Sequence, residues 1–600
     1  MRLPVFAHTG PRGWVAFVAA AAVLIVLPLV LSDPFFILVL QSLAYLFIAA
    51  LGLDILVGWT GQISLGHAGL YAVGAYTSAL ATTTLGWPFW LSAPAGVALA
   101  GVFGALLALP SLRAKGPYLA MVTVAFGFMA EVTANRWSLT GGPMGIMAIP
   151  GPKLPGGAEM TPTQYFWLIA GAALLCQLVA NNLLTSRVGR TLRALRGSEI
   201  AAETVGIDVY RWKVLAFVVS SVYAGLGGVF FAHQNGFINS DTFVFSLSVS
   251  FLTSVLMGGS GTLYGPLVGS VILNLIPTIF AKMHEYHLYI YGGIILVTII
   301  FLPDGIVGSL LKLRVWQRFR RAPAPIAPDR TALRFDAPVD GLGPVIAVRG
   351  LSRSFGGIRA LNNVTLEVRP GVVHGLIGPN GSGKSTFVNV LTGLYPPSGG
   401  HVECKGAVIG RAKPHRMARL GITRTFQSIR LFGDLTVLDN VMVGFHLHLR
   451  AGFFAHLART RGALEEEATY QRRAMALLEL VGIADRAHDL AQNLSYGQQR
   501  LLEIARALAV RPTLLLLDEP AAGVNPTEIH HLATIIRAIK AAGVTLVVIE
   551  HHMELIMGIS DVVSVLDFGE KIAEGTTREI QDNPKVIEAY LGSAVESSHA

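Results

Sequence analysis

Charged residues are scarce in this sequence, and cysteine is nearly absent. Asp, Glu, Lys and Arg make up 14% of the 600 residues, whereas ordinary globular chains carry about a quarter. Hydrophobic residues make up 52%, so part of the chain is expected to meet a solvent other than water. The two cysteines, Cys176 and Cys404, offer no disulfide framework, which fits a reducing cytoplasm.

The charges are also distributed unevenly, being sparse before about Leu310 and ordinary after it. A net charge of +9 could indicate a nucleic-acid partner, but the basic residues form no binding stripe. Much of the excess lies beside apolar spans, where positive charge marks cytoplasmic loops. We therefore expect a membrane half and a soluble half, and no nucleic-acid partner.

Apolar segments long enough to cross about 30 Å of hydrocarbon recur in the first half. Roughly ten spans are predicted, at 14–32, 35–57, 64–86, 89–110, 117–135, 162–184, 213–235, 244–259, 262–281 and 286–302. The first resembles a signal peptide, but its length and the spans that follow favour an uncleaved helix. The prediction is an all-α polytopic membrane domain over residues 1–312.

Basic residues in the connecting loops predict the orientation of these spans. Arg113 and Lys115 mark one cytoplasmic loop, four arginines between 187 and 196 mark a second, and the tail after Leu311 marks a third. The loops 141–157 and 235–241 are poor in positive charge and are expected to face outward. An even number of spans satisfies all of these loops and places both termini in the cytoplasm. The expected location is a bacterial-type cytoplasmic (inner) membrane.

The loop 186–213 contains a predicted short helix. Ser198 can cap its first turn through a side-chain oxygen, and Gly206 can end it in the left-handed conformation. The residues between them make about two turns, with Ala201 and Val205 on one face. So short a helix is unstable alone in water, so it needs a docking partner.

Small and polar residues are concentrated in the segment Gly58–Gly69. Its glycines can allow close packing of helices. Alternatively, Gln62, Ser64 and His67 line a translocation path, since polar groups in hydrocarbon are costly and usually face an interior. Both interpretations stay open.

A Pro- and Arg-rich linker is predicted over residues 313–344. At about 3.3 Å per residue it could stretch toward ~100 Å. Such reach would let the following domain dock beside its own membrane domain or a neighbouring one.

Residues 345–600 alternate strand and helix patterns, as in an α/β nucleotide-binding domain. A P-loop pattern follows the strand-like segment Val372–Ile377 and opens a helix. Its backbone N–H groups can surround phosphate oxygens, Lys384 can neutralise the β- and γ-phosphates, and the Ser385 hydroxyl can hold Mg²⁺. The predicted ATP-binding residues of the loop are Gly378, Pro379, Asn380, Gly381, Ser382, Gly383, Lys384, Ser385 and Thr386.

A second strand pattern, Leu514–Asp518, ends in a carboxylate. Asp518 is expected to support Mg²⁺ together with Ser385. Glu519 follows and is the predicted catalytic base, placed to accept a proton from, or to orient, the attacking water. The predicted fold of this half is an α/β P-loop NTPase that uses ATP and Mg²⁺.

Further motifs make this half resemble the ATPases of ABC transporters. The segment Leu494, Ser495, Tyr496, Gly497 and Gln498 is similar to the ABC signature. The resemblance implies that Gln427 contacts Mg²⁺ and the permease, that His551 touches the γ-phosphate and that Phe355 stacks on adenine. It also implies that the signature segment completes the ATP site of a partner domain.

Two positions depart from the ABC pattern, because Asn525 and His552 stand where family members often carry aspartate. Neither change removes a group needed for hydrolysis. The Asn525 position puts the communication between two ATP sites in doubt.

The whole chain resembles the branched-chain amino acid importer family. Residues 33–310 are similar to its permease through Leu56–Gly69, Lys115–Ala120, Leu139–Pro143 and Phe231–His233. Residues 345–593 are similar to one of its ATPases through Arg424–Phe432, Glu519–Pro526 and Val586–Gly592. Family members usually keep these parts as separate subunits, so the fusion is a departure. The resemblance also identifies a coupling helix that includes Glu199, Ala201, Ala202 and Gly206.

The resemblance implies ATP-driven import of branched-chain (hydrophobic) amino acids. It further implies three partners: a second permease subunit, a second ABC ATPase subunit and a periplasmic or extracellular solute-binding protein. Urea, short amides, organic acids or other amino acids are alternative cargoes. A homodimeric half-exporter has about this length but normally six long spans, and a membrane-anchored ATPase sensor would carry no solute.

Overall fold

The computed structural model of the chain describes residues 11–31, 33–111, 117–154, 156–279, 286–312, 325–333, 335, 343–409 and 412–591. The chain divides into two compact units. The membrane unit comprises Met1–Leu192, Tyr210–Ala322 and His456–Ala458, and the ATP-binding unit comprises Arg193–Val209, Pro323–Ala455 and Arg459–Ala600. Arg113, Lys115 and most of the predicted linker lie outside the described residues.

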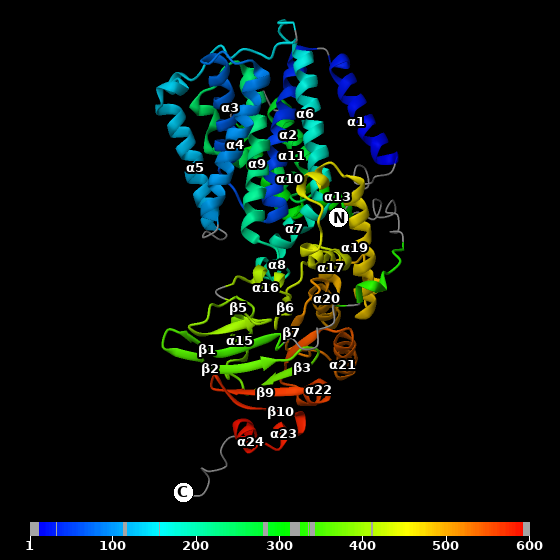
Figure 1. The fold of residues 1–600 in the computed structure, drawn as a ribbon. Helices are drawn as coiled ribbons and strands as arrows, with labels where there is room; N and C mark the ends of the chain where they lie inside the picture. The colour runs from blue at the N-terminus through cyan, green and yellow to red at the C-terminus, as the bar shows by residue number, and fades with distance from the viewer. Residues whose placement is uncertain are drawn as a thin grey trace. The chain divides into compact units, whose positions relative to one another are not determined.

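An apolar helix occupies each of the ten predicted span ranges (Figure 1). These helices are α1 (Pro11–Val30), α2 (Pro34–Thr60), α3 (His67–Thr83), α4 (Phe89–Ser111), α5 (Pro117–Arg136), α6 (Pro162–Leu184), α9 (Val209–Asn235), α10 (Phe245–Gly258), α11 (Gly265–Ile279) and α12 (His287–Phe301). Within the described residues, six segments are long and apolar enough to cross a membrane. They lie in α2, α4, α5, α6 and α9, and in Ser240–Gly258, which contains α10. The all-α membrane class is confirmed, and the span count is supported for six of the ten.

The connection between α2 and α3 is not helical. Helix α2 ends at Gly61, whose φ is +71°, and α3 begins at His67. A Cβ on Gly66 would collide with the Thr123 carbonyl, and one on Gly69 would lie 2.9 Å from the Phe126 ring. The glycines of this segment therefore do allow close packing, while its polar side chains at 62, 64 and 67 are buried.

Two sheets form the centre of the ATP-binding unit. The larger sheet has the strand order β10-β9-β3-β8-β7-β6, with β3 parallel to β8 and β9, and β7 parallel to β6 and β8. The smaller antiparallel sheet has the order β2-β1-β4-β5. The strands are β1 (Ile346–Phe355), β2 (Ile358–Val368), β3 (Val373–Ile377), β4 (Gly399–Cys404), β5 (Ala407–Ile409), β6 (Ile422–Arg424), β7 (Leu514–Asp518), β8 (Thr545–Ile549), β9 (Val562–Asp567) and β10 (Glu570–Gly575).

Ten helices are described between Lys384 and Leu591, and α18 lies partly in the membrane unit. They are α15 (Lys384–Leu391), α16 (Pro414–Arg419), α17 (Val437–Gly444), α18 (Phe453–Leu457), α19 (Arg461–Leu480), α20 (Tyr496–Ala509), α21 (Pro526–Ala541), α22 (Met553–Ile559), α23 (Thr577–Gln581) and α24 (Pro584–Leu591). Three further helices precede this set in the sequence: α7 (Arg187–Gly197), α8 (Glu199–Thr204) and α13 (Gly305–Lys312).

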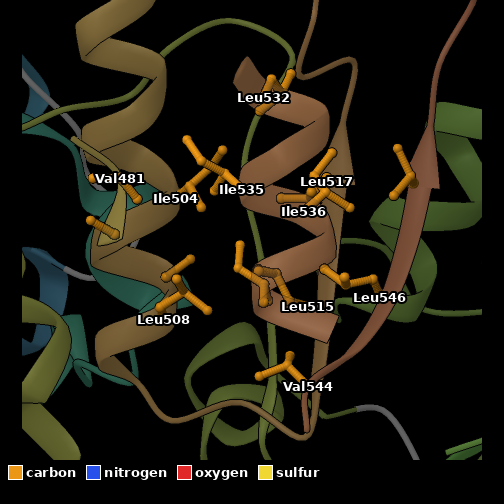
Figure 2. Close-up of a cluster of buried hydrophobic side chains, with 14 of the residues drawn as sticks. Val481, Ile504, Leu508, Leu515, Leu517, Leu532, Ile535, Ile536, Val544 and Leu546 are labelled. Atoms are coloured by element: carbon orange, nitrogen blue, oxygen red, sulfur yellow. The ribbon is translucent and has the colours of Figure 1, made fainter. Parts of the chain in front are cut away.

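A hydrophobic core fixes the end of strand β7. Figure 2 shows Leu515 and Leu517 of β7 on the side of α21 that carries Ile536, while Ile535 of α21 lies beside Ile504 of α20. Every residue of β7 is buried, as expected for a parallel strand covered on both faces. Because such cores are close-packed, the residues that follow β7 are held in a defined place.

Candidate nucleotide site

The predicted phosphate-binding loop connects β3 to the first residue of α15. Gly378, Gly381 and Gly383 have φ values of +151°, +83° and +97°, a region that favours glycine. A Cβ on Gly383 would also lie 2.5 Å from the Ala360 carbonyl. The loop therefore presents backbone N–H groups at a helix N-terminus, which is an arrangement suited to phosphate.

The Lys384 side chain is folded into this loop and is buried. Its ammonium donates hydrogen bonds to the carbonyls of Gly378 and Pro379, at 2.8 and 2.9 Å. Burial lowers the pKa of Lys384, while the nearby carboxylates of Glu519 and Asp518 oppose this shift. Phosphate oxygens can replace the carbonyls as acceptors, so the cation is ready for an anionic ligand.

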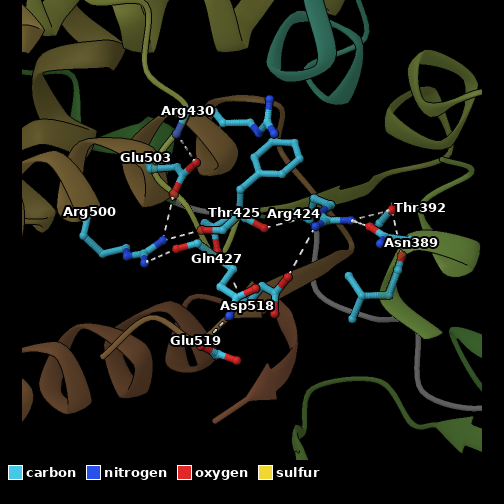
Figure 3. A network of polar contacts seen from close by, with 12 residues as sticks. Asn389, Thr392, Arg424, Thr425, Gln427, Arg430, Arg500, Glu503, Asp518 and Glu519 are labelled. Atoms are coloured by element: carbon cyan, nitrogen blue, oxygen red, sulfur yellow. Dashed lines mark hydrogen bonds and ion pairs between the residues drawn. The ribbon is translucent and has the colours of Figure 1, made fainter. Parts of the chain in front are cut away.

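Asp518, at the end of β7, is paired with an arginine that the sequence analysis did not single out. Arg424 at the end of β6 donates to the Asp518 carboxylate over 3.3 Å (Figure 3). Arg424 also donates to Asn389 of α15 and to Thr392, the residue that caps this helix, at 2.6 and 3.2 Å. Burial raises the pKa of Asp518, and Arg424 opposes this shift. The other carboxylate oxygen, Asp518 Oδ1, is buried and has no hydrogen-bond partner among the described residues.

The three predicted catalytic residues come together although they lie far apart in the sequence. The Gln427 amide donates to one oxygen of Glu519 over 3.0 Å, and His551 Nε2 lies 3.2 Å from the other oxygen. Glu519 has a φ of +48°, which is unfavourable for a non-glycine residue and is typical of functional sites. This geometry can hold a carboxylate base and two neighbouring polar groups around one reacting centre.

Glu550 is a second residue that sequence reasoning missed. Its buried carboxylate accepts hydrogen bonds from the backbone N–H groups of Ala521, His551 and His552, at 2.6, 3.0 and 3.3 Å. Glu550 therefore ties the segment after Glu519 to the segment that carries His551. A carboxylate directly after a buried strand was the available signal.

A buried ionic cluster joins helix α20 to the segment Phe426–Arg430, which is called the Gln427 segment below. The Glu503 carboxylate lies 3.2 Å from Arg500 and 3.6 Å from Arg506. It also accepts from the backbone N–H of Arg430, while Arg500 donates to the carbonyls of Phe426 and Gln427 (Figure 3). Burial raises the pKa of Glu503, and the two arginines oppose this shift. Charges three residues apart on an otherwise buried helix face were the missed signal.

The signature segment begins α20. Ser495 caps this helix, accepting from the Gln498 N–H over 3.4 Å, and the Gln498 side chain accepts from the Ser495 N–H over 3.2 Å. Tyr496 is exposed. No hydrogen bond or ion pair among the described residues joins this segment to the phosphate loop, so the structure does not bring these two predicted sites together.

The predicted adenine-stacking residue, Phe355, ends strand β1 and is exposed. Its ring meets Tyr395 edge-on at 5.3 Å between centroids, and the Arg353 guanidinium lies 4.5 Å from its centre. Asn525, one of the two departures, caps helix α21 by accepting from the Glu528 N–H over 2.9 Å.

The predicted coupling helix, α8, is packed into the ATP-binding unit. Ser198 caps it, and Ala201 and Ala202 are completely buried. The helix contacts α16, and a Cβ on Gly206 would lie 2.6 Å from the Leu447 side chain. The docking partner that so short a helix needs is thus present among the residues of the same unit.

The sequence matches known families in both halves. Residues 35–301 match the family described as the permease component of the branched-chain amino acid transport system. Residues 361–522 match the ABC transporter family, and residues 570–596 match the branched-chain amino acid ATP-binding cassette transporter family.

Curated relatives match each half separately. The branched-chain amino acid transport ATP-binding protein LivG of Salmonella typhimurium is 44% identical over 252 residues, which cover 42% of this chain and 99% of LivG. BraF of Pseudomonas aeruginosa, a high-affinity branched-chain amino acid transport ATP-binding protein, is also 44% identical over 252 residues, which cover 42% of this chain and 99% of BraF. The permease protein LivM of Escherichia coli K12 is 34% identical over 284 residues, which cover 43% of this chain and 67% of LivM. At these identities and coverages, the chain belongs to the branched-chain amino acid ABC transporter family and carries a permease component and an ATP-binding component in one polypeptide.

Proposed function

We propose that this chain imports branched-chain amino acids across the cytoplasmic membrane, driven by ATP hydrolysis. It is a multi-pass membrane protein with an ABC ATPase domain on the cytoplasmic side. The observation that carries the proposal is the joining of LivM-like and LivG-like sequences in one chain whose Gln427, Glu519 and His551 side chains meet.

ATP is the nucleotide that the family uses, and we assign its contacts to the phosphate loop. Lys384 holds the β- and γ-phosphates, and Phe355 stacks on adenine. A Mg²⁺ ion fits the end of β7, because Asp518 Oδ1 is buried without a protein partner and Ser385 is exposed at the start of α15. Mg²⁺ would neutralise charge that develops on the phosphates, and Gln427 would contact it.

Hydrolysis needs a base and a group near the γ-phosphate. Glu519 would accept a proton from the attacking water, and His551 would contact the γ-phosphate. The signature residues Leu494–Gln498 would serve the ATP bound to a partner domain. This division would explain why no hydrogen bond or ion pair among the described residues joins the signature segment to the chain's own phosphate loop.

Helix α8 would transmit closure of the ATPase domains to the membrane helices. It lies between α7 and α9 in the sequence, and movement of its binding site would pass along the chain to the start of α9. The buried cluster around Glu503 links the Gln427 segment to α20, which gives the ATP site a path to the signature segment.

ABC importers of this kind work with other subunits. We propose a second permease subunit, a second ABC ATPase subunit and an external solute-binding protein as partners. Selection among amino acids, urea or short amides would then depend largely on the binding protein.

Uptake of labelled leucine in cells with and without this chain tests the function. Glu519→Gln keeps the shape of the side chain but removes the base, so leucine uptake is expected to fall at least 100-fold while ATP binding persists. Glu465→Gln removes an exposed carboxylate on α19 and should leave uptake unchanged.

Labelled urea measured in parallel distinguishes the alternatives. Loss of urea uptake without loss of leucine uptake would replace the proposed cargo. Vigorous leucine uptake by the Glu519→Gln variant would contradict the assignment of the base.

A further inference from the structure

A cluster of aromatic side chains lies in the interior of the membrane unit. The aromatic cluster consists of His67, Tyr71 and Tyr76 of α3, Phe231 of α9, Phe243 of the short helix Ser240–Phe243, and Phe251 of α10. The Tyr71 ring contacts Phe251, Phe231 and Phe243 at centroid distances of 5.5, 5.7 and 6.1 Å. His67 contacts Phe251 at 5.6 Å, and Tyr76 contacts Phe243 at 5.5 Å. All members except Phe231 are buried.

Three polar atoms of this cluster have no hydrogen-bond partner among the described residues. They are His67 Nδ1 and the hydroxyl oxygens of Tyr71 and Tyr76. His67 Nε2 lies 2.9 Å from the Ala49 carbonyl. A carbonyl only accepts, so Nε2 carries the proton and Nδ1 is a free acceptor. Buried polar atoms without partners destabilise a fold, so three of them in one aromatic cluster call for a ligand.

Other buried tyrosines of the same unit do have partners. The Tyr165 hydroxyl donates to the Phe230 carbonyl over 2.8 Å, and the Tyr223 hydroxyl donates to the Cys176 carbonyl over 2.9 Å. Among the tyrosines of this unit that are buried as whole residues, Tyr45, Tyr165 and Tyr223 therefore have hydroxyl partners, whereas Tyr71 and Tyr76 have none among the described residues.

The unpaired atoms are spread along one helix. Nine residues separate His67 from Tyr76, which corresponds to about 14 Å along α3. Tyr76 contacts Phe243, which lies two residues after the loop 235–241 that is predicted to face outward. The unpaired atoms therefore follow α3 away from the end of that loop, and polar groups within membrane segments commonly mark solute pathways.

We propose that the aromatic cluster is a solute-contact site for an amino acid zwitterion on its way through the permease. The Tyr76 hydroxyl donates a hydrogen bond to the carboxylate at one position along α3. About one and a half turns further along, the Tyr71 hydroxyl donates to the carboxylate while His67 Nδ1 accepts from the ammonium group. The phenylalanine rings contact the apolar side chain. This inference rests on the proposed function and names the membrane residues that meet its substrate.

Tyr71→Phe, compared with Tyr165→Phe in the complete transport complex, tests the proposal. Each change removes one buried hydroxyl, but only the Tyr165 hydroxyl has a protein partner. Tyr71→Phe is expected to lower kcat/KM for leucine uptake about tenfold or more, because a hydrogen bond to a charged group is lost. Its Tm should stay equal or rise, because the hydroxyl that is removed has no partner among the described residues.

Tyr165→Phe should show the opposite pattern, a lower Tm with uptake retained. Tyr76→Phe provides a second variant with the Tyr71→Phe pattern. Uptake at the wild-type rate by both cluster variants would overturn the proposal, and so would a loss of uptake accompanied by a fall in Tm as large as that of Tyr165→Phe. Failure of the proposed function differs, because then the wild-type complex itself transports no leucine.

Discussion

The guanidinium of Arg424 lies 3.3 Å from the carboxylate of Asp518, and the two side chains are only 6% and 4% exposed. Arg424 also reaches α15, the helix that follows the phosphate loop, through Asn389 and Thr392. One buried cation therefore connects the strand that ends in Asp518 with the helix that begins at Lys384. Breaking a buried pair by removing one partner leaves an uncompensated charge.

Arg424→Met is expected to destabilise the ATP-binding domain by about 3–5 kcal/mol in the absence of nucleotide. The methionine fills most of the volume but leaves the Asp518 carboxylate without its counter-ion. Chemical unfolding of the purified protein, followed by a signal from the ATP-binding domain, measures the change. Arg486→Met is the matched control, because Arg486 pairs with Asp489 at 3.3 Å on the exposed surface. That change should cost below about 1 kcal/mol, and equal costs for the two variants would contradict the assigned role of Arg424.

Local patterns made part of this site predictable. The phosphate loop needs glycine at fixed positions between a strand and a helix, and that order is visible in the residues themselves. Ser198 and Gly206 likewise bracket a short helix, and the structure has α8 between them, with Gly206 at a φ of +91°. Such features depend on neighbours in the sequence, so the sequence contains the information.

The partners of the buried charges could not be predicted in this way. Arg424 and Asp518 are 94 residues apart, and the Arg430 N–H that bonds Glu503 is 73 residues from it. Their contact depends on β6 lying beside β7 in the sheet, an order that no local pattern reveals. The hydrogen-bond partners of hydroxyls in the membrane unit could not be predicted for the same reason, since the Phe230 carbonyl that accepts from Tyr165 lies 65 residues away.

Gly206→Ala is expected to impair transport more than ATP hydrolysis. The added Cβ would lie 2.6 Å from the Leu447 side chain, and a φ of +91° is unfavourable for alanine. Helix α8 would then fit its binding site poorly, so closure of the ATPase would move the membrane helices less. Leucine uptake and ATP turnover, measured together in the complete complex, should show the transport-to-hydrolysis ratio falling about tenfold for a coupling loss of ~1.4 kcal/mol.

Gly462→Ala is the control for this change, because a Cβ at Gly462 meets nothing within 4 Å. Gly206→Ala combined with Leu447→Ala relieves the collision while leaving the backbone strain, so it should restore part of the ratio. A Gly206→Ala variant with a normal ratio would show that the fit of α8 against Leu447 does not limit coupling.

His374 should make the ATP-binding domain sensitive to mild acid. The side chain is buried in β3, and its Nε2 lies 2.9 Å from the Ser564 hydroxyl. Burial lowers the pKa of His374 to about 4, a shift that Glu574 opposes and Lys571 reinforces. The unfolded chain binds the proton near pH 6.5, whereas the folded chain resists it down to about pH 4. Above about pH 6.5 the ring is neutral in both states, so His374 does not reduce the free energy of unfolding. As the pH falls from about 6.5 toward about 4, the unfolded chain gains a proton that the folded chain does not, and the free energy of unfolding falls.

His374→Gln removes the titrating group and keeps a polar contact to Ser564. Between pH 7 and pH 4.5, the free energy of unfolding of the wild type should fall by about 2–3 kcal/mol more than that of the variant. His401→Gln is the control, because His401 is exposed and lies 2.9 Å from Glu403. Parallel pH profiles for the wild type and His374→Gln would mean that the folded domain accepts the proton at His374, which requires that Ser564 or water reorganises around the ring.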